Sequence, residues 1–130
     1  MRKLSVERVY GCSTFHRHGL VVLPENRLAL IAGAHLIIVE ISTGQRQWIS
    51  FVSIEFLFVS PSGNILAVID RSISDDQTKI ILLSSKSFER FLVIESNRFG
   101  HFRSLTMNFD ETILIVLHDR PGYMLTIRND

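Results

Sequence analysis

The residues best suited to chemistry are five histidines, and two of them, His16 and His18, are separated by a single residue. On a strand this spacing places both imidazoles on one face, where they could bind a cation. No carboxylate or thiolate accompanies them at the spacing of a metal-ligand set. We therefore interpret the pair as part of a polar arm and expect no metal site. The other histidines are His35, His101 and His118.

Nucleophilic and phosphate-binding motifs are also absent from the sequence. Cys12 is near His16 and His18 only along the chain, and there is no Gly-x-Ser-x-Gly elbow. The glycines are scattered between apolar runs, so no nucleotide site is indicated. Asp75 and Asp76 lack the further oxygen ligands that Ca²⁺ requires. The sequence thus predicts no catalytic residue, no cofactor and no enzyme.

The composition is that of a globular chain that buries a core. Of the 130 residues, 46% are hydrophobic and 21% are charged, and the net charge is +1. The interspersed signs leave no electrostatic footprint for nucleic acid. No apolar run reaches the roughly 20 residues of a membrane helix, and the N-terminus lacks the apolar centre of a secretory signal. The single cysteine favours a reducing compartment, with the cytoplasm as the expectation.

A modest positive bias in the middle of the chain could face an acidic surface such as a tubulin lattice. So few dispersed charges are largely screened at physiological salt. Ordinary solvated side chains are the simpler interpretation. The residues concerned are Arg71, Lys79, Lys86, Arg90, Arg98 and Arg103.

The elements that would position these groups follow a repeat. The stretch Ser60–Asp70 is a polar turn followed by an apolar run, and Leu23–Ile31 and Asn108–Val116 have the same form. A hairpin that recurs about every 40 residues in an all-strand pattern predicts the blades of a β-propeller. The expected blades cover about residues 19–51, 54–94 and 102–128.

Each predicted blade divides into short strands between turns rich in glycine and polar residues. The solid apolar runs Leu36–Val39 and Ile80–Leu83 indicate strands buried on both faces. The polar segment Asp70–Thr78 is expected to be a loop, either simply solvated or available for contacts. The predicted strands are Leu20–Leu23, Leu28–Ala32, His35–Ile41, Arg46–Phe51, Ile54–Val59, Ile65–Ile69, Lys79–Leu83, Phe88–Ile94, Phe102–Met107, Ile113–Leu117 and Tyr123–Ile127.

The third blade lacks a fourth strand unless the arm formed by residues 1–18 supplies it. Propellers close with four to eight blades, so about two and three-quarter blades are an incomplete ring. The chain is then a fragment of a longer propeller, or copies self-associate, or the strands close as a small barrel. In the first two cases apolar blade faces would be left bare. The aromatic residues expected on them are Phe56, Phe58, Phe99, Phe102 and Phe109.

The turns resemble the WD40 repeat, which has Gly-His before its first strand, a Ser-Pro-Asp-Gly-like turn after it, and Trp-Asp near the end of its third strand. Gly100-His101 and Ser60–Gly63 occupy the first two positions, and Val39–Gly44 replaces the Trp-Asp segment. The resemblance covers about residues 19–128. It implies an all-β, incomplete WD40-like propeller of four-stranded antiparallel blades. It also implies a non-catalytic scaffold for protein–protein interaction.

In this family the Gly-His histidine hydrogen-bonds an aspartate in the turn between the second and third strands. The resemblance therefore implies a structural polar pair between His101 and Asp119. The rest of the family's network needs a Ser or Thr and the Trp, where this chain has Val116 and Ile127. Any such pair would be a truncated remnant.

A narrower resemblance concerns Val9-Tyr10-Gly11 together with the Ser-Pro-Ser-Gly-Asn-x-Leu-Ala-Val motif at Ser60–Val68. This order is similar to the amino-terminal start of WD-repeat proteins of cilia and flagella. It implies a cytoplasmic protein of the axoneme with axonemal or microtubule-associated partners. The alternative function is that of a small β-barrel binding an apolar ligand, which would require one continuous rolled sheet.

Overall fold

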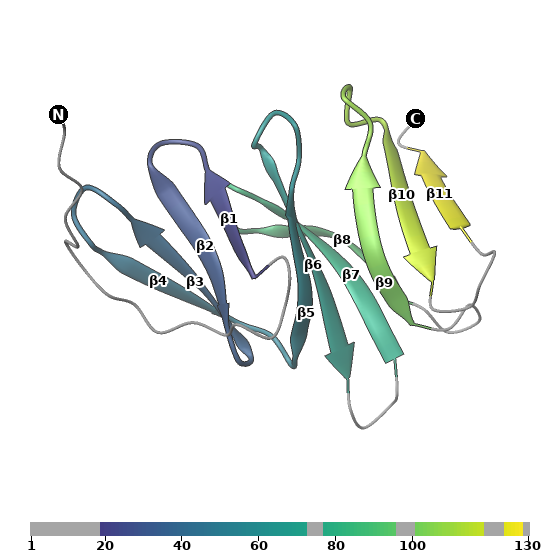
Figure 1. Ribbon diagram of the computed structural model, residues 1–130, viewed down its shortest axis with the longest axis horizontal. Coiled ribbons are helices and arrows are strands. Elements are labelled where there is room, and N and C mark those ends of the chain that lie inside the picture. Colours follow the sequence, from purple (N-terminus) through teal and green to yellow (C-terminus); the bar gives the residue numbers. More distant parts are fainter. Residues whose placement is uncertain (1–18, 73–76, 96–100, 119–123, 129–130) are drawn as a thin grey trace, which may run out of the picture.

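The computed structural model describes residues 19–72, 77–95, 101–118 and 124–128, and every regular element in these ranges is a β-strand (Figure 1). The strands form three antiparallel sheets, called blades 1, 2 and 3 below. Blade 1 contains β1 (Leu20–Leu23), β2 (Arg27–Ala32), β3 (His35–Glu40) and β4 (Arg46–Ser50). Blade 2 contains β5 (Ile54–Val59), β6 (Ile65–Ser72), β7 (Gln77–Ser84) and β8 (Arg90–Glu95). Blade 3 contains β9 (Phe102–Met107), β10 (Ile113–His118) and β11 (Met124–Arg128).

Within each blade the strands pair in the order in which they occur in the chain. The ladders of the described strands stay within their own blade, and the blades pack face to face with β1 beside β5 and β5 beside β9 (Figure 1). This is the arrangement of propeller blades. It confirms the predicted all-β, incomplete propeller, and the alternative of a single rolled sheet is wrong for the described residues. The predicted arm, residues 1–18, lies outside them.

Two apolar layers hold the blades together. The first lies between blades 1 and 2 and the second between blades 2 and 3. Both predicted two-sided strands are confirmed, because all residues of Leu36–Val39 and Ile80–Leu83 are buried. Since β6 and β7 supply residues to both layers, blade 2 is covered on both faces.

Both ends of the predicted loop Asp70–Thr78 are strand, which corrects the sequence interpretation there, while residues 73–76 lie outside the described residues. The β6 strand continues to Ser72 and β7 begins at Gln77. Asp70 is only 6% exposed and Thr78 is fully buried. Their polar side chains are satisfied in the interior because they accept hydrogen bonds from backbone amides at the junctions between blades, as described below.

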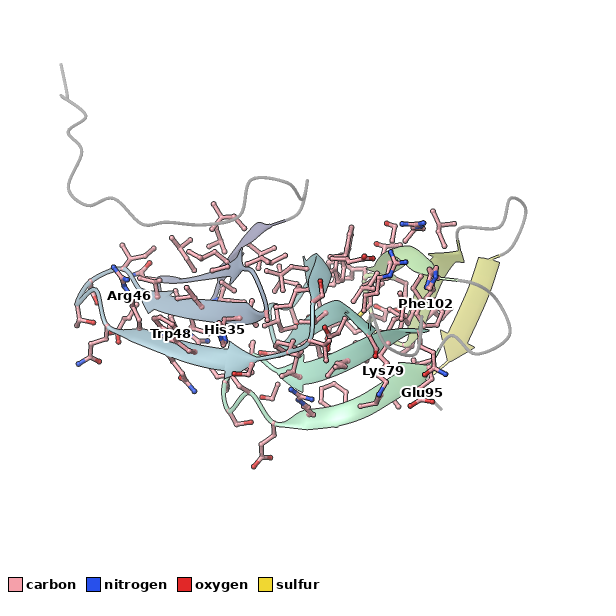
Figure 2. The ribbon with its side chains drawn as sticks, turned by 90° about the horizontal axis from the view of Figure 1, so that it is seen from below. His35, Arg46, Trp48, Lys79, Glu95 and Phe102 are labelled. Carbon is pink, nitrogen blue, oxygen red and sulfur yellow. The ribbon has the colours of Figure 1, made fainter. Side chains whose placement is uncertain are left out.

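Of the phenylalanines expected on uncovered blade faces, some are exposed and others are buried. Phe102 is 1% exposed and lies in the layer between blades 2 and 3 (Figure 2). Phe56 and Phe58 are half-buried against the same layer. Phe109 is 87% exposed at the tip of a hairpin, and Phe99 lies outside the described residues. The expectation is therefore wrong for Phe102, because a neighbouring blade already covers it.

The repeated turn has the same backbone hydrogen bonds in blades 2 and 3. The amide of Ser60 donates to the Ile65 carbonyl at 2.9 Å, and the amide of Asn108 donates to the Ile113 carbonyl at 3.2 Å. In each turn the first side chain also accepts from the last amide, at Ser60 Oγ (3.1 Å) and Asn108 Oδ1 (2.8 Å). The hairpin of blade 1 is shorter, since Leu23 pairs directly with Arg27. Two of the three predicted copies are thus equivalent in detail.

Candidate interaction surface

A buried carboxylate fixes the junction between blades 1 and 2. Asp70, near the end of β6, accepts from the Val52 amide at 3.0 and 3.1 Å and from the Ser53 amide at 2.7 Å. Val52 and Ser53 belong to the linker between β4 and β5. Hydrogen bonds to an ionised acceptor are among the stronger ones in proteins. Asp70 therefore attaches the linker between β4 and β5 to β6, an inner strand of blade 2.

Thr78 has the equivalent role at the next junction. Its Oγ1 accepts from the Phe102 amide at 2.8 Å, which joins β7 of blade 2 to β9 of blade 3. Sequence reasoning placed both Asp70 and Thr78 in a surface loop because they are polar. The signal that could have identified them is their position directly beside the long apolar runs of β6 and β7.

At the opposite end of β6 the repeated turns touch one another. A Cβ atom at Gly63 would lie 2.6 Å from Pro24 Cγ, so blade 2 approaches the blade 1 hairpin closely. The Ser62 amide donates to Glu111 Oε1 at 2.8 Å, which links the turns of blades 2 and 3. Hydrogen bonds from the Ser62 hydroxyl, and to a smaller extent from its amide, lower the pKa of Glu111. The blades are thus fixed at both ends of their strands.

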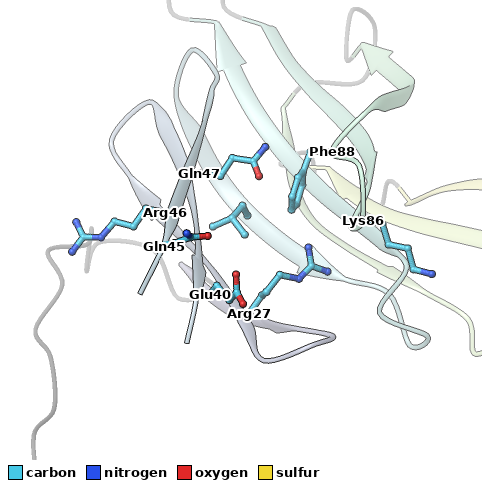
Figure 3. A pocket seen from close by; sticks show the side chains of 8 residues that line it. Arg27, Glu40, Gln45, Arg46, Gln47, Lys86 and Phe88 are labelled. Atoms are coloured by element: carbon cyan, nitrogen blue, oxygen red, sulfur yellow. The ribbon is translucent and has the colours of Figure 1, made fainter. Parts of the chain in front are cut away.

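A cavity of about 170 Å³ lies at the junction of blades 1 and 2. Figure 3 shows Arg27, Glu40, Gln47 and Phe88 around it, while the side chains of Arg46 and Lys86 point away. Ile38, Gln45, Arg46 and Lys86 complete its lining.

Arg27 forms one wall of this cavity and bridges the two blades. Its Nη1 donates to the Ser85 carbonyl at 2.8 Å and its Nε to the Pro24 carbonyl at 3.0 Å. Its guanidinium carbon lies 5.7 Å from the centroid of the Phe88 ring. This geometry is that of a cation–π contact. The cavity is therefore preformed by side chains that are already held in place.

Phe88 occupies a backbone conformation that favours glycine. Its φ is +59°, and the matching position of the blade 1 turn is Gly44 with φ +73°. The two turns share a hydrogen bond, since Phe88 N donates to the Ser84 carbonyl at 2.8 Å and Gly44 N to the Glu40 carbonyl at 2.7 Å. A bulky residue in this region is strained. Packing of the ring against the first apolar layer and Arg27 offsets that strain.

Two residues after Phe88 begins β8, the outermost strand of blade 2. Three consecutive large apolar residues on it are exposed: Phe91 (56%), Leu92 (38%) and Val93 (48%). Among the described strands β8 pairs only with β7, so its other edge presents backbone donors and acceptors. We call the cavity-lining residues Arg27, Gln47 and Phe88 together with the exposed edge-strand residues Phe91, Leu92 and Val93 the rim surface. Val93 lies opposite Ile81 on the face toward blade 1, and Leu92 lies opposite Leu82 on the face toward blade 3.

Arg90 holds the start of β8 against blade 1. Its Nη2 donates to the Ser50 carbonyl at 3.0 Å, and its guanidinium carbon lies 4.8 Å from the centroid of the Phe51 ring. Two other members of the predicted basic bias also have internal partners. Arg71 Nη1 lies 3.4 Å from Glu55 Oε1. Lys79 Nζ lies 3.6 Å from Glu95 Oε1 (Figure 2). These contacts favour the interpretation of ordinary surface side chains.

The other candidate residues do not assemble into a chemical site in the described ranges. His101 precedes β9 and is half-buried, but Asp119 lies outside the described residues, so the polar pair stays a prediction. His35 lies beside Ser50, with 3.3 Å between Nδ1 and Oγ. Across the described part of the chain, no three His, Cys, Asp or Glu residues gather around a possible metal position. The same residues include no helix capable of crossing a membrane. Outside them lie Cys12, His16, His18, Asp75, Asp76 and Arg98.

Comparison with known proteins identifies the fold. No protein-family model matches the chain, and no curated protein sequence matches it either. Among solved structures, a chain of the mitotic checkpoint complex matches with a TM-score of 0.64 and 11% identity over 97% of this chain. The WD40 repeats of RRP9 match with a TM-score of 0.61 and 18% identity over 78% of it. The β-propeller domain of the Trilobed protease from Pyrococcus furiosus, which has an open velcro topology, matches with a TM-score of 0.61 and 16% identity over 84% of it.

The share of these structures that the chain spans is small. It covers 44% of the checkpoint chain, 33% of RRP9 and 38% of the protease domain. At such low identity the likeness concerns the fold, and these propellers come from proteins with different activities. The chain therefore has the fold of an incomplete WD40-like β-propeller and spans less than half the length of the propellers that it matches.

Proposed function

We propose that the chain is a non-catalytic scaffold for protein–protein interaction, part of a WD40-type propeller that acts in the cytoplasm in a ciliary or flagellar axoneme assembly. The observation that carries the scaffold proposal is the rim surface. Single exposed apolar residues are common on proteins, but an outermost strand that exposes large apolar side chains on both of its faces, with a preformed cavity beside one of them, is less so.

The rim surface suits an extended segment of a partner protein. Such a segment can pair with the free edge of β8 through backbone hydrogen bonds, while Phe91, Leu92 and Val93 supply apolar anchors. The buried contacts of Asp70 and Thr78 hold the blades in register. A rigid surface loses little conformational entropy on binding, which favours affinity.

The axonemal part of the proposal rests on the sequence resemblance of Val9–Gly11 and Ser60–Val68. The expected partner is accordingly an axonemal or microtubule-associated protein. No feature of the described residues supplies a cofactor site, and none is part of the proposal.

Site-specific photocrosslinking tests this function. A photoreactive phenylalanine analogue is placed at position 91 of the full chain in ciliated cells, and the control analogue is placed at Phe109, which is more exposed but lies outside the rim surface. The expected result is a crosslink from position 91 to an axonemal protein and none from position 109. Equal labelling from both positions, or none from position 91, would contradict the scaffold proposal. Labelling of a partner outside the axoneme would contradict only the localisation.

A further inference from the structure

The cavity between blades 1 and 2 contains hydrogen-bond donors that the fold does not use. A guanidinium has five N–H donors. In Arg27 one donates to the Pro24 carbonyl and one to the Ser85 carbonyl, so Nη2 and one hydrogen of Nη1 have no partner among the described residues. The side-chain amide of Gln47 likewise has no partner among them. Figure 3 shows both side chains extending toward Phe88 at the wall of the cavity, where a molecule that enters can use these donors.

The charge of the cavity lining is predominantly positive. Of the described residues that line it, Arg27, Arg46 and Lys86 are cationic and Glu40 is the carboxylate. Glu40 accepts a hydrogen bond from the Ser42 hydroxyl at 3.3 Å, and within the described part of the chain it forms no ion pair with Arg27. The guanidinium of Arg27 is therefore a fixed positive charge that the lining does not neutralise by direct contact.

These features favour an anionic guest with a single charge. An apolar side chain would bury the free donors of Arg27 and Gln47 without partners, and a cationic one would be repelled by the guanidinium. A carboxylate is an acceptor only, so it can satisfy both donors and adds no unpaired donor of its own. A phosphate dianion is less well matched, because Glu40 repels its second charge. Figure 3 also shows the other two cations of the lining, Arg46 and Lys86, pointing away.

The position of the cavity beside β8 indicates which molecule supplies the carboxylate. Phe88 lies two residues before β8 begins, and Gln47 lies on β4, the outermost strand of blade 1. In a segment that pairs with β8, successive side chains alternate between the two faces of the sheet. Those on the same face as Val93 point toward blade 1, which is the side of the cavity. An acidic side chain at such a position is placed to enter it.

We propose that the cavity binds the carboxylate of an aspartate or glutamate in the partner segment that pairs with β8, with Arg27 and Gln47 as its hydrogen-bond donors. The identity of the partner rests on the proposed scaffold function, whereas the preference for a carboxylate rests on the cavity alone. The volume of about 170 Å³ accommodates one such side chain. The acidic residue adds specificity to the apolar contacts of the rim surface.

Capped amino acids test the cavity without knowledge of the partner. N-acetyl-glutamate N-methylamide is titrated into the isotope-labelled full chain, and the nuclear magnetic resonance signals of the Arg27 side chain and the Phe88 amide are followed. The same derivatives of glutamine, lysine and phosphoserine are the comparison probes. The expected result is saturable binding of the glutamate derivative in the millimolar range and weaker binding of the other three.

Two substitutions in the lining establish the sign of the guest's charge. Glu40→Gln removes a repelling carboxylate and should tighten binding of the glutamate derivative about two- to fivefold. Gln47→Glu should weaken it by at least as much, because it adds a negative charge and removes a donor. Asp110→Asn and Thr106→Glu make the same charge changes at exposed positions of blade 3 and should have no effect. Far-UV circular dichroism establishes that each variant is folded.

The proposal is overturned if the glutamate derivative does not bind or if its binding shifts only signals outside the cavity lining. Weaker binding in Glu40→Gln would also overturn it, because that is the response of a site for a cation. Tighter binding of the phosphoserine derivative would assign the cavity to a modified residue instead. A crosslinked partner segment without an acidic residue would overturn the proposal as well, since nothing in it could supply the carboxylate.

The crosslink from position 91 tests the scaffold function separately. Binding of the glutamate derivative without that crosslink would support the carboxylate site and contradict the scaffold. The crosslink without binding of the glutamate derivative would support the scaffold and contradict the carboxylate site.

Discussion

Replacing Asp70 with alanine is expected to weaken the junction of blades 1 and 2 more than any surface substitution. The carboxylate is 6% exposed and accepts from two backbone amides, those of Val52 and Ser53, at 2.7–3.1 Å. A hydrogen bond to a charged group contributes about 1.5–3 kcal/mol to stability. The amides regain part of their solvation when the carboxylate is removed, so the expected loss is about 2–4 kcal/mol rather than the full sum.

Asp70→Asn measures the contribution of the negative charge in the same experiment, because asparagine has nearly the same shape as aspartate. An amide oxygen can still accept one of the two hydrogen bonds, so the expected loss is about half that of alanine, or roughly 1–2 kcal/mol. The assay is equilibrium urea unfolding followed by far-UV circular dichroism. Asp110→Ala is the control, because Asp110 is an exposed turn residue. Surface substitutions typically change the free energy of unfolding by no more than about 0.5 kcal/mol. If the free energies of unfolding of Asp70→Ala and the Asp110→Ala control differed by less than this, the structural role of Asp70 would be refuted.

Three further predictions concern the other contacts between blades. Thr78→Val removes the acceptor for the Phe102 amide and should cost about 1–2 kcal/mol in urea unfolding, whereas Thr78→Ser should be close to neutral; equal losses would argue against the hydrogen bond. Phe88→Gly should be less destabilising than Phe88→Ala by about 1 kcal/mol, because only glycine relieves the positive φ; the reverse order would show that the turn is unstrained. The pKa of Glu111 is lowered in the folded state, mainly by the Ser62 hydroxyl. Its contribution to stability is therefore present above the unfolded-state pKa and lost as the pH falls through the folded-state pKa. Glu111→Gln should flatten this acid-side loss of unfolding free energy, and an unchanged pH profile would contradict the contact.

The strand pattern could be predicted because the repeat is local. Every observed strand lies within three residues of its predicted bounds, since turn residues and apolar runs alternate regularly along the chain. The turn at Ser60–Gly63 was identified from residue type alone, because a side-chain acceptor and a glycine with positive φ are local requirements.

The contacts between blades could not be predicted in the same way. Asp70 and Thr78 are polar, and only the position of the neighbouring blades shows that they bind backbone amides at the blade junctions: Asp70 binds amides of a linker, and Thr78 binds the amide of Phe102 in β9. Phe102 differs in the opposite direction. Its side chain was expected to be exposed, but it is buried against blade 2. The burial of these three side chains depends on contacts with neighbouring blades rather than on local propensity.

The rim surface also escaped sequence reasoning. The segment Phe88–Ile94 was predicted as a strand, but its apolar run does not show locally that Phe91, Leu92 and Val93 stay exposed. The strained backbone of Phe88 was equally hidden, because its turn matches the Gly44 turn only in three dimensions.

The most direct test of the scaffold account is amide hydrogen exchange across β8, measured in the free chain and in a complex with the partner identified by crosslinking. Pairing of a partner strand with the free edge predicts new protection at alternate residues of β8, because successive amides point to opposite sides of a strand. Unchanged exchange in β8, with protection appearing only elsewhere in the chain, would contradict the account.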